Sequence, residues 1–173
     1  MLNQVVSHTP LWVWPLLLGL LWLGLNQTVT RSVPLRRVSL VALGMALWSL
    51  YGTLSAFGSQ GWVLPAWLVG AGLLATLVLR TPLPTGTHYD DWTGRFTLPG
   101  SWVPLGLILG IFLTKYAVGA SLRLQPALAA STAFTVGFSV LYGAFSGAFL
   151  ARAVRLLRLA TGWSATPRRV VTE

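Results

Sequence analysis

Lys115 is a charged residue well inside an apolar stretch of the sequence, between Leu113 and Tyr116. A charged group at the centre of a membrane-spanning helix costs about 2.5–3.5 kcal/mol on insertion scales, so such a residue is a functional candidate. The apolar stretches contain no Asp, Glu or His that could pair with it. Three roles remain open: an ammonium that snorkels to the outer lipid headgroups, an internal structural cation, and a cation that binds an anionic ligand.

Two sets of hydroxyl-bearing or aromatic side chains recur at helical spacing, so each set would share one helix face. They are Thr135, Ser139, Tyr142 and Ser146 in the last apolar stretch, and Trp48, Tyr51 and Ser55 in the second. We expect both faces to point into a helix bundle and to line a binding site with Lys115, although hydroxyls can also bond back to their own helix carbonyls. Tyr51 should lie at the depth of Lys115, which makes a contact between these two side chains feasible.

His88, Asp90 and Asp91 are of metal-ligand type and close in sequence. Without a fourth partner they give a weak metal signal, and a solvated turn in which an aspartate pairs with Arg95 is the simpler interpretation. The sequence contains no Ser/His/Asp or Cys/His set, no HExxH motif and no phosphate-binding loop. We therefore expect no enzyme, no cofactor and no metal, and the residual enzymatic alternative would use His88 and Asp90 at the cytoplasmic face.

The composition indicates which elements must position these residues. Of the 173 residues, 54% are hydrophobic, 9% are charged and none is cysteine. A soluble fold of this size cannot bury so much apolar surface, because a small domain hides only about two thirds of the area of its unfolded chain. Five stretches approach the ~20 residues that cross a bilayer, namely residues 10–28, 38–58, 62–79, 102–120 and 132–150. We predict an all-α integral membrane protein whose five transmembrane helices form a single bundle within residues 1–160.

The positions of the arginines predict the orientation of this bundle. Most of them follow the first, third and fifth stretches: Arg31, Arg36, Arg37, Arg80, Arg95, Arg152, Arg155, Arg158, Arg168 and Arg169. The loops on the other side contain only Arg123. By the positive-inside rule the N-terminus lies outside and the C-terminus in the cytoplasm. The net charge of +9 then reflects topology, and no nucleic-acid partner is expected.

The segment 80–101 between the third and fourth spans is polar. Its Thr and aromatic residues predict a short cytoplasmic β-hairpin with Gly94 at positive φ. In this hairpin Trp92 and Phe96 should dip into the membrane interface.

Basic residues follow the last span. Arg152, Arg155 and Arg158 recur every three residues and should extend the last helix by a turn or two along the membrane surface. With Arg36 and Arg37 they would fix the topology and attract anionic lipid headgroups. Residues 161–173 are expected to form a flexible basic tail.

Short motifs recur in the two halves of the chain. Trp12-Val13-Trp14-Pro15 and Leu50-Tyr51-Gly52 in the first two spans correspond to Trp102-Val103-Pro104 and Leu141-Tyr142-Gly143 in the last two. Because the third span intervenes, the second pair would be inverted, giving a 2+1+2 repeat of the kind that places a site near the midplane of many transporters. The identities are few, so chance recurrence is the alternative.

Glycines four residues apart predict where helices pack. Gly106 and Gly110 stand in the fourth span, and Gly143 and Gly147 in the fifth. Small residues at this spacing let helices approach closely, either within the bundle, in a homo-oligomer or against a partner membrane protein.

Longer patterns are found in three segments of the second half. They are His88-Tyr89-Asp90 with Thr93-Gly94-Arg95-Phe96 and Pro99-Gly100-Ser101-Trp102, then Ile111-Phe112-Leu113-Thr114-Lys115-Tyr116, and finally Leu141-Tyr142-Gly143 with Ser146-Gly147, Phe149 and Arg152. Through them the sequence resembles a family of small bacterial multi-pass inner-membrane proteins of unknown function. The resemblance implies a bacterial inner membrane and no particular activity.

Two functions remain open. The first is a small carrier or permease component for a small anionic or amphipathic molecule, which would contain a cavity reaching Lys115, Tyr51 or Tyr142. The alternative is a structural or accessory subunit that has a solid core and docks a partner membrane protein through its glycine faces.

Overall fold

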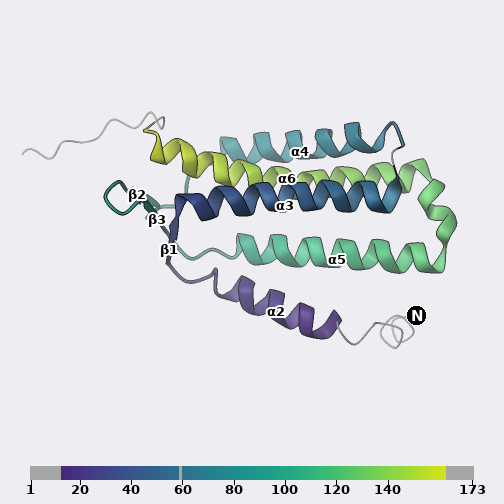
Figure 1. Cartoon of the computed structure of the whole chain (residues 1–173), viewed down its shortest axis with the longest axis horizontal. Helices are drawn as coiled ribbons and strands as arrows, with labels where there is room; N and C mark the ends of the chain where they lie inside the picture. Colours follow the sequence, from purple (N-terminus) through teal and green to yellow (C-terminus); the bar gives the residue numbers. More distant parts are fainter. Residues whose placement is uncertain (1–12, 59, 163–173) are drawn as a thin grey trace, which may run out of the picture.

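In the described part of the chain, five α-helices lie side by side along one axis, and a three-stranded sheet lies at one end of them (Figure 1). The computed structural model describes residues 13–58 and 60–162. The helices are α2 (Val13–Leu25), α3 (Leu35–Phe57), α4 (Val63–Arg80), α5 (Val103–Leu124) and α6 (Thr132–Ala160), with the 3-10 helix η1 (Pro126–Ala130) before α6. The strands are β1 (Arg31–Pro34), β2 (His88–Asp90) and β3 (Arg95–Leu98).

Four of the helices, α3 to α6, are long and apolar enough to cross a membrane. The mostly helical architecture agrees with the sequence prediction, but α2 has only 13 described residues. The first predicted span runs from residue 10 to residue 28. Residue 10 lies outside the described residues, and the helix ends at Leu25 rather than at residue 28. The helix stops at Leu25 because the chain turns there, and the Thr28 hydroxyl donates to the Leu25 carbonyl at 2.7 Å.

Helix α6 is longer than predicted and continues without a break to Ala160. The prediction ended the span at residue 150, where arginines begin, and placed the next turns on the membrane surface. Instead Ala151, Ala153 and Leu156 are buried, so one face of this arginine-bearing segment packs against the rest of the protein. Residues 163–173, including Arg168 and Arg169, lie outside the described part of the chain.

The sheet joins two loops that are far apart in sequence. Its strand order is β1-β3-β2, all antiparallel, with Arg31 opposite Leu98 and His88 opposite Thr97. The predicted β2–β3 hairpin is present, and Gly94 has the expected positive φ of 63°. Strand β1 was not predicted, and its terminal Pro34 suits an edge position.

Phe96 forms the centre of this end of the molecule. It is completely buried and packs with Val33 of β1 and Leu156 of α6. Its predicted place at the membrane interface is therefore wrong, whereas Trp92 at the hairpin tip is 98% exposed. The sheet is thus attached to the end of α6 by an apolar cluster of its own.

Glycines create the closest helix contact, between α4 and α6. An added Cβ at Gly143 or Gly147 would overlap the backbone carbonyls of Trp67 and Ala71, and one at Gly70 would overlap that of Val140. Helix α6 packs mainly on α4 and α3, whereas α2 packs mainly on α5 and α5 touches α6 much less. The bundle therefore consists of a tight α3–α4–α6 group and a separate α2–α5 pair.

Gly106 and Gly110, both on α5, differ in how closely other helices approach them. A Cβ at Gly110 would stand 3.0 Å from the Phe145 ring, which places this residue at the α5–α6 contact. At Gly106 no neighbour in the described part of the chain lies within 4 Å of such a Cβ. Gly106 therefore does not contribute to packing among the described helices.

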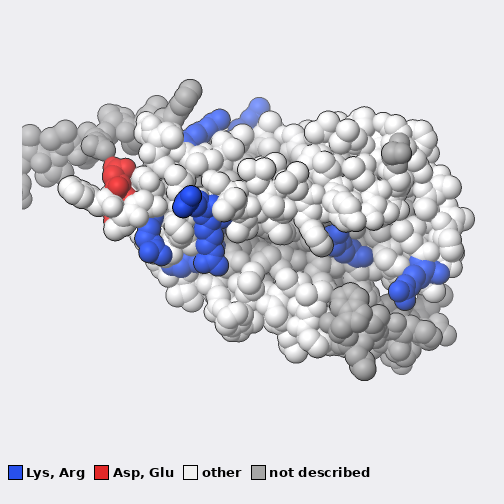
Figure 2. All heavy atoms as spheres, in the orientation of Figure 1, with Lys and Arg blue, Asp and Glu red and all other residues white. Residues whose placement is uncertain are grey.

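The pairing of β1 with β3 brings together the loops that bear most of the arginines. Figure 2 shows most basic side chains at the end that carries the sheet, with the acidic side chains beside them. Arg123 belongs to the last turn of α5, at the opposite end. The partition of charge between the two ends is the one expected from the sequence.

The elements related by the proposed repeat pack in pairs, α2 on α5 and α3 on α6. The corresponding tyrosines, however, are not equivalent: Tyr51 is 68% exposed and Tyr142 only 4%. Trp12, which begins the first motif, lies outside the described residues.

Candidate functional site

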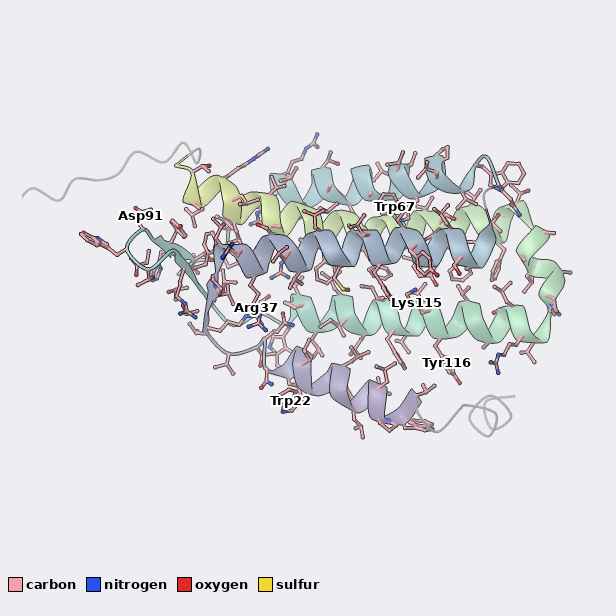
Figure 3. All side chains as sticks on the ribbon, in the orientation of Figure 1. Trp22, Arg37, Trp67, Asp91, Lys115 and Tyr116 are labelled. Atoms are coloured by element: carbon pink, nitrogen blue, oxygen red, sulfur yellow. The ribbon has the colours of Figure 1, made fainter. Side chains whose placement is uncertain are left out.

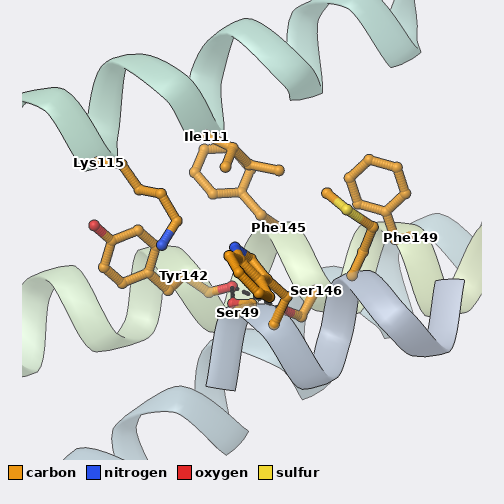
Figure 4. A pocket seen from close by; sticks show the side chains of 9 residues that line it. Ser49, Ile111, Lys115, Tyr142, Phe145, Ser146 and Phe149 are labelled. Carbon is orange, nitrogen blue, oxygen red and sulfur yellow. Dashed lines mark hydrogen bonds between the residues drawn. The ribbon is translucent and has the colours of Figure 1, made fainter. Parts of the chain in front are cut away.

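The Lys115 side chain extends from α5 toward α3 and α6 (Figures 3 and 4). Its ammonium lies 5.3 Å from the centre of the Tyr142 ring on α6. It also lies against Gly52 of α3, where an added Cβ would stand only 2.7 Å from Nζ. The ammonium thus faces the bundle interior, and the contact with Tyr51 considered from the sequence is replaced by one with Tyr142.

The surroundings of this ammonium are aromatic rather than ionic. A cation over an aromatic face gains about 0.5–2 kcal/mol, depending on desolvation. Among the described residues, no hydrogen-bond acceptor pairs with Lys115. The charge is therefore held between helices by the Tyr142 ring, in space that Gly52 leaves free.

A small cavity adjoins Lys115 at the seam between α5 and the α3–α6 pair (Figure 4). Its volume is about 20 Å³, and its lining is Met45, Trp48, Ser49, Ile111, Lys115, Tyr142, Phe145, Ser146 and Phe149. A cavity of this size holds about one water molecule. In this conformation the seam has no room for a larger molecule.

Hydrogen bonds fix the α3–α6 side of the cavity. Trp67 Nε1 donates to Ser49 Oγ at 3.3 Å, and Ser49 Oγ donates to the Tyr142 carbonyl at 3.2 Å. The Ser146 hydroxyl donates to the same carbonyl at 3.1 Å. The backbone of Tyr142 is thus anchored from two helices, which holds its ring under the ammonium.

The hydroxyl face predicted for the last helix points inward. Its four members are all buried: Thr135, Ser139, Tyr142 and Ser146. Thr135 and Ser146 bond back to carbonyls of their own helix, as the alternative interpretation held, and Thr135 also accepts from Trp62 Nε1 at 3.4 Å. The Ser139 hydroxyl is buried without a partner in the described part of the protein.

The face predicted for α3 is largely exposed. Trp48 and Tyr51 are 66% and 68% exposed, although Trp48 also lines the cavity. The buried face of α3 instead consists of Ala42, Ala46, Thr53 and Phe57. Small residues at helical spacing mark the packed side of a membrane helix, because they admit close approach, and large apolar side chains face lipid. Ser49 and Gly52 are also small residues of α3, so this pattern would have predicted that they lie on its packed side.

The polar hairpin forms a self-contained turn. The Asp90 carboxylate accepts hydrogen bonds from the Thr93 hydroxyl at 2.6 Å and from the Trp92 N–H at 3.0 Å. These bonds stabilise the charged form and lower the pKa of Asp90 below its ordinary value. Arg95 is the cross-strand neighbour of Asp90. Within residues 13–58 and 60–162, no three His, Asp or Glu side chains gather as a metal site.

A family model matches residues 1–167 of the chain. The protein belongs to DUF6622, a family of unknown function. This confirms the resemblance to an uncharacterised family. No curated protein and no solved structure matches the DUF6622 chain.

The DUF6622 protein has a second polar region, at the sheet end. Arg155 of α6 donates from Nη1 to the Thr81 hydroxyl at 3.1 Å and from Nη2 to the Pro82 carbonyl. Arg31 of β1 donates from Nη2 to Gln27 Oε1 at 2.8 Å. Burial, and then the charge of Arg37, lower the pKa of Arg31. Arg36, Arg37 and Arg158 are exposed.

Proposed function

We propose that this DUF6622 protein is a small carrier, or a permease component, for a small anion in a bacterial inner membrane. One observation carries the proposal: the Lys115 ammonium points between α5 and the α3–α6 pair and lies 5.3 Å from the Tyr142 ring. A cation in this position needs a counter-charge, and the apolar helices supply no carboxylate. A transported anion would supply it.

The chemistry of the seam suits an anion smaller than a metabolite. Lys115 would attract the anion, and this attraction is stronger in a medium of low dielectric constant than in water. The Tyr142 ring and the apolar lining would exclude bulk water around it. The cavity volume of about 20 Å³ limits a resident ligand to a size near that of water.

Transport would require the two helix groups to move relative to each other. The light contact between α5 and α6, against the close glycine contacts of α4 with α6, supports motion of the α2–α5 pair on a rigid α3–α4–α6 group. Pairing of α2 with α5 and of α3 with α6 is also what an inverted repeat would produce. Lys115 would then lie at the moving seam.

The orientation follows from the arginines. We infer five spans, with the N-terminus outside and the sheet and the C-terminus in the cytoplasm, since cytoplasmic loops retain Arg and Lys. The 13 described residues of α2 would form part of the first span.

The test is anion flux into proteoliposomes, measured by light scattering with chloride, nitrate and formate as probes. The wild-type protein should exceed empty vesicles for at least one probe, and Lys115→Met should return to their level. Arg123→Gln is the matched control, because it removes a cation from the same helix at its far end. Equal flux in wild type and Lys115→Met, with both inserted, would refute the carrier.

The water-sized cavity favours a second candidate, an accessory subunit with a packed core. Gly106 on α5 would then mark the docking face, because no described neighbour lies near it. In that case all probes would fail, and Gly106→Leu would release a co-purifying membrane subunit while Lys115→Met would not.

A further inference from the structure

The end of the bundle that carries the sheet is strongly basic. Its described arginines are Arg31, Arg36, Arg37, Arg80, Arg95, Arg152, Arg155 and Arg158. The acidic residues in the described part of the chain are Asp90 and Asp91, in the hairpin, and Figure 3 shows Asp91 at the hairpin's outer end. The Asp90 carboxylate is already occupied by Thr93 and Trp92.

Three of these arginines form a group. Arg152 and Arg155 stand one turn apart on α6, and β1, which carries Arg31, packs on the same part of α6 through the cluster of Val33, Phe96 and Leu156. From this neighbourhood the like charges of Arg31 and Arg155 act on Arg152. Packing therefore holds the guanidinium groups near one another against their mutual repulsion.

Two members of the group are oriented by neutral acceptors. Gln27 holds Arg31, while Thr81 and Pro82 hold Arg155, and a guanidinium has five N–H donors, so both keep donors free. Arg152 is half-buried and makes no hydrogen bond to any described residue. The group therefore combines neighbouring positive charges with free N–H donors.

We propose that Arg31, Arg152 and Arg155 form a binding site for a phosphate group. Planar guanidinium forks match phosphate oxygens in pairs, and several around one phosphate give strong, charge-assisted hydrogen bonds. The site does not depend on the carrier proposal, because it lies at the sheet end and does not include Lys115.

The phosphate can come from an anionic phospholipid or from solution. The length of α6 favours the lipid: its 29 residues extend about 43 Å, whereas the hydrocarbon core is about 30 Å thick. The last turns, with Arg152 and Arg155, would then emerge at the level of the headgroups. Both sources share the same chemistry, and the experiment separates them.

The experiment uses native mass spectrometry of the full-length protein in micelles with equimolar phosphatidylglycerol and phosphatidylcholine. Wild type should retain phosphatidylglycerol preferentially, and Arg152→Gln and Arg31→Gln should each weaken that retention about fivefold, since one arginine near a headgroup is worth about that factor. Arg36→Gln is the matched control, because this exposed arginine lies at the same end outside the group. Arg152→Lys keeps the charge without the fork and should weaken retention less than Arg152→Gln.

A second arm adds millimolar inorganic phosphate to protein in phosphatidylcholine alone and follows the Tm. A rise in wild type that Arg152→Gln abolishes would support the site with free phosphate as its source. Retention of phosphatidylglycerol that inorganic phosphate cannot displace would support the lipid. The proposal fails if neither probe binds preferentially, or if Arg36→Gln weakens binding as much as Arg152→Gln while circular dichroism shows all variants folded.

Discussion

Gly143 of α6 faces the backbone carbonyl of Trp67 on α4 so closely that a side chain at position 143 would overlap the carbonyl oxygen. Backbone rather than a flexible side chain stands in the way, so the helices themselves would have to separate. Trp67 also donates to Ser49 of α3. The Gly143–Trp67 contact therefore sets the spacing of the whole α3–α4–α6 group.

Replacing Gly143 by Val should lower the free energy of unfolding by about 1–3 kcal/mol, the usual cost of overpacking. Thermal unfolding in detergent, followed by circular dichroism, measures the change. Gly72→Val is the matched control on α4, because nothing described lies within 4 Å of a Cβ there. Equal destabilisation by the two substitutions would contradict the contact.

Gly52→Ala should displace the Lys115 ammonium rather than the helices. The new Cβ would stand 2.7 Å from Nζ, the mobile end of a long side chain. The free energy of unfolding should change by less than about 1 kcal/mol, while any Lys115-dependent anion flux falls. In Lys115→Met, Gly52→Ala should have no further effect on flux, and an additive loss would refute the coupling.

Phe96→Ala should destabilise the protein by about 3–5 kcal/mol, because it removes a completely buried aromatic ring and leaves a cavity. The nearby Trp92→Ala removes a larger side chain that is 98% exposed, so it should leave the Tm unchanged. Comparable losses in the two variants would show that the sheet is not packed around Phe96.

The hairpin turn should weaken in acid. Because the pKa of Asp90 is lowered in the folded state, its contribution is present above the unfolded pKa, about 3.9, and is lost as the pH falls through the lower folded value. Carboxyl NMR titration should find the pKa of Asp90 below its ordinary value. Thr93→Val removes the 2.6 Å hydrogen bond and should raise the pKa of Asp90, and an unchanged value would contradict the assignment.

Periodicity in the sequence predicted α6 well and α3 poorly. On α6 the hydroxyls of Ser139 and Ser146 are also small residues, so the polar face and the packed face coincide. On α3 they do not, because Trp48 and Tyr51 are large and exposed and the packed side runs through Ala42 and Ala46. Side-chain size was the better guide in both helices.

Contacts between distant segments were beyond local patterns. Strand β1 is four residues long, and two helices separate it in sequence from its partner β3. The residues around Val33 therefore did not predict a strand. The burial of Phe96 follows from that pairing. The direction of the Lys115 side chain could not be predicted from the sequence, because the room at Gly52 depends on how α3 and α5 meet.

The pairing of β1 with β3 has a consequence for how the chain matures. The ribosome delivers β1 first, and its partner appears only after α3 and α4 have been synthesised. If α3 and α4 both span a bilayer, the backbone groups of β1 stay unpaired until the second loop reaches the same side. A chain in which one helix failed to insert, or inserted backwards, would leave the two loops on opposite sides and the strands apart. Completion of the sheet thereby distinguishes correctly threaded copies from misthreaded ones.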